Sequence, residues 1–389
     1  MAITSAHVAR APRIRLGMVG GGRGAFIGAV HRIAARIDDQ YELVAGAFSS
    51  DPDRSAASAA DLGVARAYGS YEEMAQKESR RKDGIEAVAI VTPNHLHAPA
   101  ALPFLKRGIH VICDKPLTAT LPEAKRLAKA IEASGTVFAL THNYTGYPMI
   151  RQARDLVAAG ELGDIRLVNV EYVQDWLAEP LEITGQKQAD WRTDPARSGA
   201  GGSTGDIGTH AFNLSNFVSG LTLDTLAADL QSFVPGRRVD DNAHVLMRYT
   251  SGARGMLWCS QVASGQENGL RLRIYGTKAG LEWEQENPNY LWVTPLGKPR
   301  YRLTRGGPGT GDAAARLTRI PAGHPEGYLE GFANIYAEAA RAIIARRDGT
   351  PLDAAVTFPG VKEGLQGVAF VDACVRSSKR NGAWTALNL

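Results

Sequence analysis

The sequence predicts an α/β fold in which a doubly wound parallel sheet is followed by an α+β domain with a large, mostly antiparallel open sheet. Three observations predict it. Strand and helix signals alternate through the first third of the chain, a glycine triplet follows the first strand, and longer strands with period-2 patterning begin after about Thr145. We expect a flexible tail at residues 1–12, a Rossmann domain at 13–145 and a second domain at 146–389.

In the first domain, short apolar runs predict buried strands, and apolar residues at helical spacing predict the helices between them. The expected strands are Ile14–Val19, Leu43–Phe48, Ile85–Val91, Ile109–Cys113 and Val137–Leu140. The expected helices are Phe26–Ile37, Ala98–Arg107 and Leu121–Ala133. Strands that alternate with helices in this way form βαβ units and a parallel sheet.

In the second domain, strands with alternating polarity are typical of an antiparallel sheet that is packed on one face. They are expected at Arg166–Tyr172, Val245–Tyr249, Ala253–Ser260 and Leu270–Tyr275, with a hairpin turn at Ser251-Gly252. Helices are expected at Met149–Ala159 and Tyr328–Ile343, and a mobile surface loop at Thr304–Asp312. The open sheet needs cover on its far face, so we expect a homo-oligomer, a dimer or tetramer, in which a second subunit supplies part of that cover.

Composition excludes several function classes. The chain has 389 residues, of which 44% are hydrophobic and 22% charged, as in soluble globular proteins. Its 44 basic residues are scattered among 40 acidic ones, which argues against a nucleic-acid partner. We expect no membrane contact, because no segment approaches the roughly 18 apolar residues that a spanning helix needs. Three widely spaced cysteines fit a reducing cytoplasm.

The glycine triplet predicts a dinucleotide site. Gly20, Gly22 and either Ala25 or Gly28 form an imperfect G-x-G-x-x-G/A pattern between the first strand and the first helix. Such glycines let a pyrophosphate approach the helix N-terminus closely. Arg23 could reach a phosphate. The alternative is a tight strand-to-helix turn without a ligand.

The end of the second strand leaves the choice between NAD and NADP open. An acidic residue at this place would bind the ribose diol, but Phe48 occupies it. Ser49, Ser50 and Arg54 could accept a 2′-phosphate instead. Asp51 could bind the diol or only open the turn that follows.

A loop with Thr92, Asn94 and His97 follows the buried strand that ends at Val91, at the sheet edge where ligands bind. We interpret it as a loop that contacts the cofactor. His95 and His97 could also indicate a metal, but further ligands at zinc-site spacing are lacking, so we expect none.

Lys115 comes just after the strand that ends at Cys113 and therefore lies at the same edge. A lysine there can stabilise a developing alkoxide; the alternative is a surface lysine. The Lys115–Pro116 bond could be cis, although only about 5–6% of such bonds are.

Asp206 and His210, four residues apart, share one face if a helix contains them, and an imidazole is suited to general acid–base work. Alternatively, Asp206 caps a helix and His210 belongs to the core. The glycine-rich run from Gly201, with Trp191-Arg192 upstream, favours a ligand-facing loop.

At these residues the chain resembles the Gfo/Idh/MocA oxidoreductases, which act on sugars and cyclitols. The resemblance covers nearly the whole chain and includes Asp114-Lys115-Pro116, where most members have Glu-Lys-Pro, and Asp206-Ile207-Gly208-Thr209-His210. It implies NAD(P) as cofactor and Lys115, Asp206 and His210 as the catalytic group. His210 would take the hydroxyl proton, Lys115 would stabilise the oxyanion, and Asp206 would orient the substrate. The implied cofactor contacts also include Asp114, Lys115, Asn143, Trp191 and Arg192. Asn213 stands where an acidic residue is common, which could alter substrate contacts.

Polar and aromatic residues in predicted loops and strand ends are typical of a site for a small polyhydroxylated substrate. We expect Lys115, His142, Tyr144, Gln174, Asp206 and His210 to contact it; Asp175, Trp176, Gln186, Lys187 and Gln188 lie in the same loops. Lys187, Arg192 and Arg197 could instead meet an anionic substituent.

The leading hypothesis is an NAD(P)-dependent dehydrogenase of a sugar, sugar derivative or cyclitol. A second is a redox-neutral, NAD-dependent glycoside hydrolase that acts through a transient keto-sugar. A third is a non-catalytic NAD(P)-binding regulator; the presence of both Lys115 and His210 argues against it.

Overall fold

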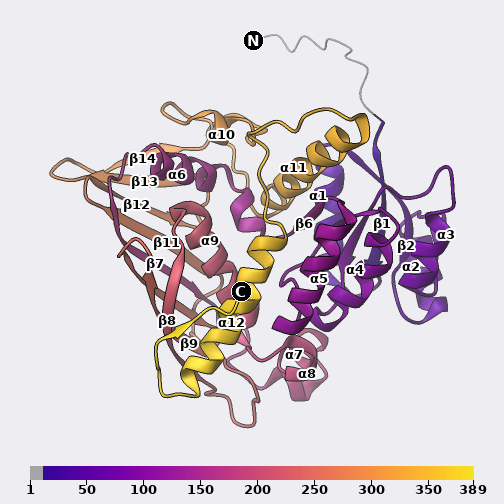
Figure 1. Ribbon diagram of the computed structural model, residues 1–389, viewed down its shortest axis with the longest axis horizontal. Coiled ribbons are helices and arrows are strands. Elements are labelled where there is room, and N and C mark those ends of the chain that lie inside the picture. Colours follow the sequence, from indigo (N-terminus) through magenta and orange to yellow (C-terminus); the bar gives the residue numbers. More distant parts are fainter. Residues whose placement is uncertain (1–11) are drawn as a thin grey trace.

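The computed structural model describes residues 12–389 and contains two sheets, each with helices packed against it (Figure 1). The expected tail at 1–12 lies outside the described residues, apart from Pro12. Within 12–389, no helix is long and apolar enough to cross a bilayer. Cys113, Cys259 and Cys374 are all buried and unpaired.

The first sheet, sheet A, has six parallel strands in the order β3-β2-β1-β4-β5-β6. They are β1 (Ile14–Gly20), β2 (Tyr41–Ala47), β3 (Arg66–Ala67), β4 (Ala87–Val91), β5 (His110–Cys113) and β6 (Phe138–Leu140). The doubly wound parallel sheet is therefore confirmed. Only β3, with two residues, was not predicted, because it is too short to show an apolar pattern. The strand order reverses between β1 and β4, and a sheet of this kind binds ligands at such a point.

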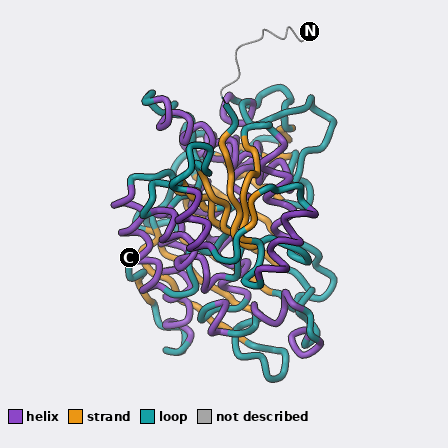
Figure 2. Tube along the Cα trace, turned by 90° about the vertical axis from the view of Figure 1, so that its right-hand side faces the viewer, coloured by secondary structure: helices purple, strands orange, loops and turns teal. Residues whose placement is uncertain are grey.

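Helices cover both faces of sheet A (Figure 2). They are α1 (Phe26–Ile37), α2 (Pro52–Asp61), α3 (Tyr71–Glu78), α4 (His97–Leu105), α5 (Leu121–Ser134), α11 (Tyr328–Asp348) and α12 (Val361–Ser378). On one face, Val30 of α1 and Phe332 and Tyr336 of α11 share a buried core with β1. On the other, α4, α5 and Val368 of α12 share another. The late helix α11 thus packs on the first sheet, although it begins only at Tyr328 and the sheet's last strand in the sequence ends at Leu140.

The second sheet, sheet B, has nine strands in the order β14-β13-β12-β11-β7-β10-β9-β8-β15. They are β7 (Ile165–Val173), β8 (Leu223–Gln231), β9 (Asn242–Tyr249), β10 (Arg254–Ser260), β11 (Gly269–Gly276), β12 (Ala279–Glu284), β13 (Tyr290–Pro295), β14 (Tyr301–Thr304) and β15 (Thr385–Ala386). All pairs are antiparallel except β7 and β10, which run parallel, so the predicted mostly antiparallel sheet is confirmed. Because β7 and β10 are parallel, both end at the same edge of the sheet.

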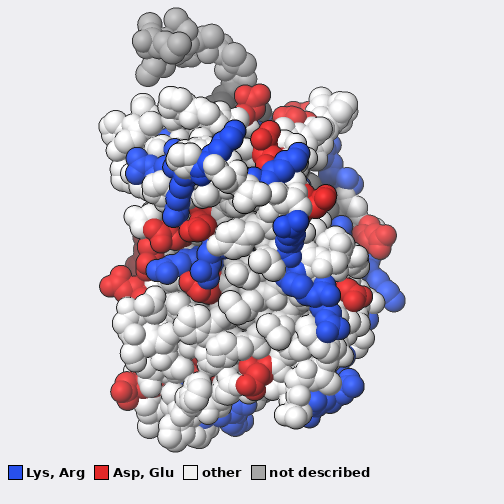
Figure 3. Space-filling model, turned by 90° about the vertical axis from the view of Figure 1, so that its left-hand side faces the viewer, with Lys and Arg blue, Asp and Glu red and all other residues white. Residues whose placement is uncertain are grey.

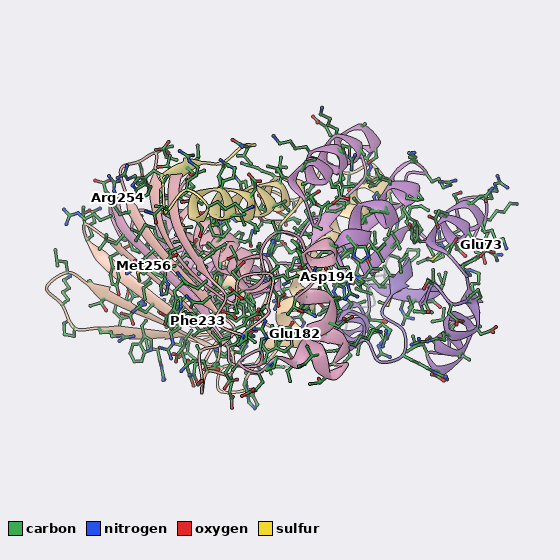
Figure 4. All side chains as sticks on the ribbon, turned by 90° about the horizontal axis from the view of Figure 1, so that it is seen from below. Glu73, Glu182, Asp194, Phe233, Arg254 and Met256 are labelled. Carbon is green, nitrogen blue, oxygen red and sulfur yellow. The ribbon has the colours of Figure 1, made fainter. Side chains whose placement is uncertain are left out.

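The two faces of sheet B differ. On the inner face, α6 (Pro148–Ala158), α9 (Thr209–Ser219) and Phe370 of α12 close an apolar core. On the outer face, Leu167, Leu246 and Met256 are exposed. Figure 4 shows Met256 and Arg254 of β10 pointing away from the helices, and Figure 3 shows this side of the molecule as largely uncharged surface with scattered charges of both signs.

A connecting segment leads from β7 to α9 through several short turns. It contains 3₁₀ turns and short helices at Leu181–Thr184, α7 (Lys187–Arg192), α8 (Pro195–Ser198) and a π-helical turn at Thr204–Gly208. Other short elements are the 3₁₀ turns Asn94–Leu96 and Asn143–Gly146 and α10 (Asp312–Ala315). Figure 4 shows Glu182 and Asp194 of the connecting segment between the two halves of the molecule. The connecting segment therefore lies between the part of the molecule that contains sheet A and the part that contains sheet B (Figure 4).

Candidate active site

Two cavities meet at the carboxyl ends of the strands of sheet A. The larger one, of about 530 Å³, runs from the glycine triplet past the end of β2 to Lys115 and Asp206. The smaller one, of about 370 Å³, shares Ile27, Gln188 and the charged residues Asp114, Lys115, Arg192 and Asp206 with the first, and it extends toward sheet B. An elongated ligand in the first cavity would thus reach a second ligand at these shared residues. We call the larger one the cofactor cavity and the smaller one the substrate cavity.

The glycine triplet is shaped by close backbone contacts. Gly20 and Gly21 have positive φ angles of 78° and 70°, a region that favours glycine. A Cβ on Gly28 would lie 2.4 Å from the Cα of Gly21, so Gly28, not Ala25, is the third glycine of the pattern. One on Gly22 would lie 2.8 Å from the carbonyl oxygen of Phe48. The open backbone before α1 is a cradle of the kind that holds a pyrophosphate.

At the far end of the cofactor cavity, Ser49, Ser50 and Arg54 line the wall. Asp51 does not. Its carboxylate accepts a hydrogen bond from the backbone N–H of Arg54 at 3.0 Å and caps α2, so it opens the turn. Arg23 also lines the cavity, and Asp61 at the end of α2 holds its guanidinium in an ion pair. The cavity therefore carries no carboxylate at this end.

The residues of the loop after β4 fall into two groups: some line the cofactor cavity and one is buried behind it. Thr92 and Asn94 line the cofactor cavity, and the amide of Asn94 donates to the carbonyl of Ser198 at 2.9 Å, which ties the connecting segment down. His97 is buried and does not line the cavity. Its two ring nitrogens contact the carbonyl oxygens of Pro116 at 2.7 Å and Thr92 at 2.9 Å. His97 thus clamps two loops together, and among the described residues no cluster of metal-ligating side chains is found.

Where the cavities meet, Asp206 is surrounded by donors from three segments. Its carboxylate accepts hydrogen bonds from Lys115 Nζ at 2.9 Å, Arg192 Nε at 3.2 Å and Gln261 Nε2 at 2.9 Å. Lys115 Nζ also donates to the Asp206 carbonyl at 2.6 Å. The Lys115–Pro116 bond is cis. Lysine and carboxylate side chains are only 14% and 18% exposed, so the ion pair is poorly screened by solvent.

The two carboxylates of the site are held in the charged form. Burial alone would favour the neutral acid, but Lys115 and Arg192 outweigh it and keep the pKa of Asp206 well below its usual range. The pKa of Asp114 is likewise lowered: His31, Lys115 and His97 outweigh the burial. The negative charge of Asp206 is therefore matched by two cations at short range.

His210 lies in the wall of the substrate cavity, and its pKa is lowered well below the usual value, chiefly by burial and further by the Lys115 charge. The imidazole is consequently neutral at neutral pH and can accept a proton. Its ring lies edge-on to those of Tyr144 at 4.9 Å and His142 at 5.3 Å. His142 does not line the substrate cavity; it lies behind His210, and burial lowers its pKa to about 3.

A buried carboxylate explains the glycine-rich run before His210. Asp240 accepts hydrogen bonds from the Gly202 N–H at 2.7 Å, the Ser203 hydroxyl at 2.7 Å and the Thr204 N–H at 2.8 Å. A Cβ on Gly202 would lie 2.1 Å from the Asp240 carbonyl oxygen. The expectation that these glycines face a ligand was wrong, because neither Gly201 nor Gly202 lines the cavities and Gly202 instead admits the Asp240 loop. Asp206 belongs to the π-helical turn rather than capping α9.

The rest of the substrate cavity is a hydrogen-bonded wall. Tyr144 and Tyr172 share a hydroxyl contact at 2.6 Å. Tyr172 and Gln174 both donate to Oδ1 of Asn268 at 2.8 Å. Such a network fixes the hydroxyl and amide groups that face the cavity, as recognition of a specific polyol requires. Asn143 adds a buried amide whose oxygen and nitrogen have no partner among the described residues.

Most of the predicted site residues therefore come together. The cofactor cavity is lined by Gly20, Gly22, Arg23, Ser49, Ser50, Arg54, Thr92, Asn94, Asp114, Lys115, Trp191 and Arg192, and the substrate cavity by Lys115, Tyr144, Gln174, Asp206 and His210. Asn143, which we expected to contact the cofactor, lines the substrate cavity instead. Asn213 faces a different hollow beside α6 and α12, away from both cavities. Arg197 pairs with Asp190 and Asp194 on the surface. Sequence reasoning missed Gln261 and the aromatic residues Phe26, Tyr328 and Phe332.

Models of one protein family match two successive parts of the chain. Residues 14–142 match the model described as "Oxidoreductase family, NAD-binding Rossmann fold", and residues 150–282 match that of the GFO/IDH/MocA C-terminal domain. The chain is 37% identical to "Uncharacterized oxidoreductase YfiI" of Bacillus subtilis (strain 168) over 95% of this chain and 96% of that protein. The chain belongs to the Gfo/Idh/MocA oxidoreductase family. Residues 14–142 form an NAD-binding Rossmann domain, as the glycine triplet predicted.

Two solved structures of similar proteins cover almost the whole chain. An oxidoreductase from Sinorhizobium meliloti is 62% identical, with a TM-score of 0.88 over 96% of this chain and 99% of that one. An inositol dehydrogenase homolog from Azotobacter vinelandii, complexed with NAD⁺, is 40% identical, with a TM-score of 0.93 over 97% and 98%. This chain therefore shares its two-sheet fold with oxidoreductases of the family.

Proposed function

We propose that the protein is an NAD(P)-dependent dehydrogenase of a neutral, polyhydroxylated ring such as a cyclitol or a sugar. The observation that carries the proposal is the meeting of Lys115, Asp206 and His210 at the junction of the cofactor and substrate cavities. The similarity to the Azotobacter inositol dehydrogenase homolog supports the same class of substrate.

The residues fit a nicotinamide cofactor. The glycine cradle before α1 suits a pyrophosphate, and Asp114 and Lys115 lie at the other end of the same cavity. When bound, the cofactor accepts the hydride that leaves the hydroxyl carbon. The protein's own side chains then have to accept the hydroxyl proton and stabilise the negative charge that develops on the hydroxyl oxygen.

His210 supplies the base. Because its imidazole is neutral, it can take the hydroxyl proton while the carbon–hydrogen bond breaks, and the alcohol becomes a carbonyl. Lys115, as a cation, donates a hydrogen bond to the same oxygen and stabilises its growing negative charge. Asp206 holds Lys115 and Arg192 in place through its carboxylate.

The charge balance favours a neutral substrate. The substrate cavity is lined by two cations, Lys115 and Arg192, and two carboxylates, Asp114 and Asp206. Arg192 is paired with Asp206, and Lys187 lines only the cofactor cavity. No unpaired cation in the described wall of the substrate cavity is left to bind a carboxylate or phosphate on the sugar.

The experiment is to follow nicotinamide absorbance while the protein meets inositols, neutral sugars, uronic acids and glycosides, with NAD⁺ and NADP⁺ separately. We expect reduction with a neutral polyol and none with a uronic acid. Lys115→Ala is the matched control: it should lose turnover and keep dinucleotide binding. Glycoside cleavage without net reduction would point to the redox-neutral hydrolase and contradict the proposal.

We also propose that the outer face of sheet B pairs with a second copy of the chain. Leu246 and Met256 are directly opposite each other on β9 and β10, and both are exposed. Exposed apolar side chains on an open sheet favour such contacts. A monomeric mass in light scattering would contradict this, and Met256→Glu should shift an oligomer toward monomers.

A further inference from the structure

A histidine outside both cavities approaches the Asp114 carboxylate from behind. His31 lies in the middle of α1 and its side chain is fully buried. Its Nε2 is 3.9 Å from Oδ1 of Asp114 and has no hydrogen-bond partner among the described residues. Its Nδ1 is 2.8 Å from the hydroxyl of Tyr336 on α11. The imidazole thus bridges α11 to the residue that precedes the catalytic lysine.

Asp114 has two distinct oxygens. Oδ1 accepts the Lys115 N–H at 2.9 Å and the Thr141 hydroxyl at 3.0 Å, and it is also the oxygen nearest His31. Oδ2 has no partner among the described residues, and Asp114 lines both cavities. A carboxylate fixed through one oxygen presents the other as a hydrogen-bond acceptor at the junction of the cavities.

The surroundings of His31 reach the substrate cavity as well. The imidazole packs against Phe332 at 5.2 Å and Tyr336 at 5.8 Å between ring centroids. Phe332, one helical turn before Tyr336, lines the substrate cavity. Tyr336 is itself anchored, since its carbonyl accepts the Tyr41 hydroxyl at 2.8 Å. The bridge therefore has a rigid base in the core of sheet A.

We propose that His31 is a positioning residue: its Nε2 side holds Asp114 so that the free carboxylate oxygen accepts a hydrogen bond from the bound dinucleotide. The proposal rests on the function proposed above, because it needs a dinucleotide in the cofactor cavity. The Nδ1 side of His31, which faces Tyr336, then has a structural role only.

The two sides of the imidazole can be tested separately, because an asparagine amide replaces the Nδ1 side and a glutamine amide replaces the Nε2 side. His31→Asn keeps a polar group for Tyr336 and loses the one that faces Asp114; His31→Gln does the reverse. The readouts are the Kd for NAD⁺ and NADP⁺, from quenching of tryptophan fluorescence, and the melting temperature. Trp191 in the wall of the cofactor cavity provides the signal.

We expect His31→Asn to raise the Kd roughly fivefold to tenfold, since the polar neighbour of Asp114 is lost and the carboxylate oxygen that accepts from the dinucleotide is no longer held, and His31→Gln to stay within about twofold of the wild type. If the histidine were only structural, the Kd would follow stability, and His31→Gln, which loses the Tyr336 contact, would bind the dinucleotide more weakly than His31→Asn. That order, or equal Kd values for the two variants, would overturn the proposal. A wild-type protein that binds neither dinucleotide would overturn the proposed function itself.

Discussion

The two ends of the cofactor cavity differ in how deeply their side chains are buried and in how these side chains are held. At the end near Lys115, charged side chains from distant segments are largely buried and satisfy one another. At the end near Arg54, three of the lining side chains, Ser49, Ser50 and Arg54, come from one short stretch after β2, and Arg54 is exposed with no ion pair among the described residues. One end is fixed by the whole fold, whereas the other depends on a few replaceable side chains.

The buried end carries the groups for the proposed proton transfer, and the open end carries those for the choice between NAD⁺ and NADP⁺. A proton transfer needs groups whose pKa values and positions are fixed, which burial and pairing provide. The choice between two dinucleotides that differ by one phosphate needs only a local change of charge. Substitutions should therefore have large and coupled effects at the buried end and small and specific effects at the open end.

After Lys115→Ala, the largest effect should come from Asp206→Asn. Without the carboxylate charge, Lys115 and Arg192 lose their shared counter-ion, and we expect kcat/KM to fall by about a hundredfold or more. Asp190→Asn is the matched control, because it removes a carboxylate from an exposed pair with Arg197 on the same connecting segment. Exposed pairs contribute about 0–1 kcal/mol, so that variant should stay near wild type. Equal losses of kcat/KM in both variants would mean that the buried ion pairs of Asp206 contribute no more to activity than the exposed pair of Asp190.

The pH dependence of turnover should be the next clearest sign of the buried end. The pKa of His210 is lowered, so its neutral form persists as the pH falls below the value of about 6.5 at which a free imidazole is half protonated. We expect kcat/KM for polyol oxidation to be unchanged between about pH 7.5 and 6.5 and to fall only below that. A profile that halves at or above about pH 6.5 would show that another group, or a solvated His210, controls the reaction.

The open end could be predicted from the sequence more completely than the buried one. Ser49, Ser50 and Arg54 follow one strand, and their order along the chain already places them together. Gln261 could not be found in this way. It follows β10, and it meets Asp206 because β10 runs parallel to β7 in an otherwise antiparallel sheet, a pairing that no local pattern reveals.

His31 and the glycine-rich run show two other limits. His31 occupies the apolar stripe of α1, so the sequence gives it the appearance of a core residue, and only the fold brings Asp114 and Tyr336 to its two nitrogens. The glycine-rich run from Gly201 predicted a ligand-facing loop, but the group that lies close to the backbone of Gly202 is the Asp240 loop and not a ligand. Patterns predict that a contact exists more easily than they identify its partner.

The smallest and most specific effect should be that of Arg54→Ala. Arg54 lines the open end, its neighbours there are the hydroxyls of Ser49 and Ser50, and Asp51 is occupied in capping α2. A guanidinium in this place can bind a 2′-phosphate, whereas NAD⁺ has only a neutral hydroxyl at the corresponding ribose position. We expect the variant to weaken NADP⁺ binding roughly threefold to tenfold and to leave the NAD⁺ affinity within about twofold.

Direct titration with both dinucleotides measures this effect, and Arg54→Lys, which keeps the charge but not the planar fork, should lie between the wild type and Arg54→Ala. An equal loss for both dinucleotides would place Arg54 at a group that they share, such as the adenine or the pyrophosphate. In that case the open end would not select between the cofactors, and the contrast between the two ends would reduce to burial alone.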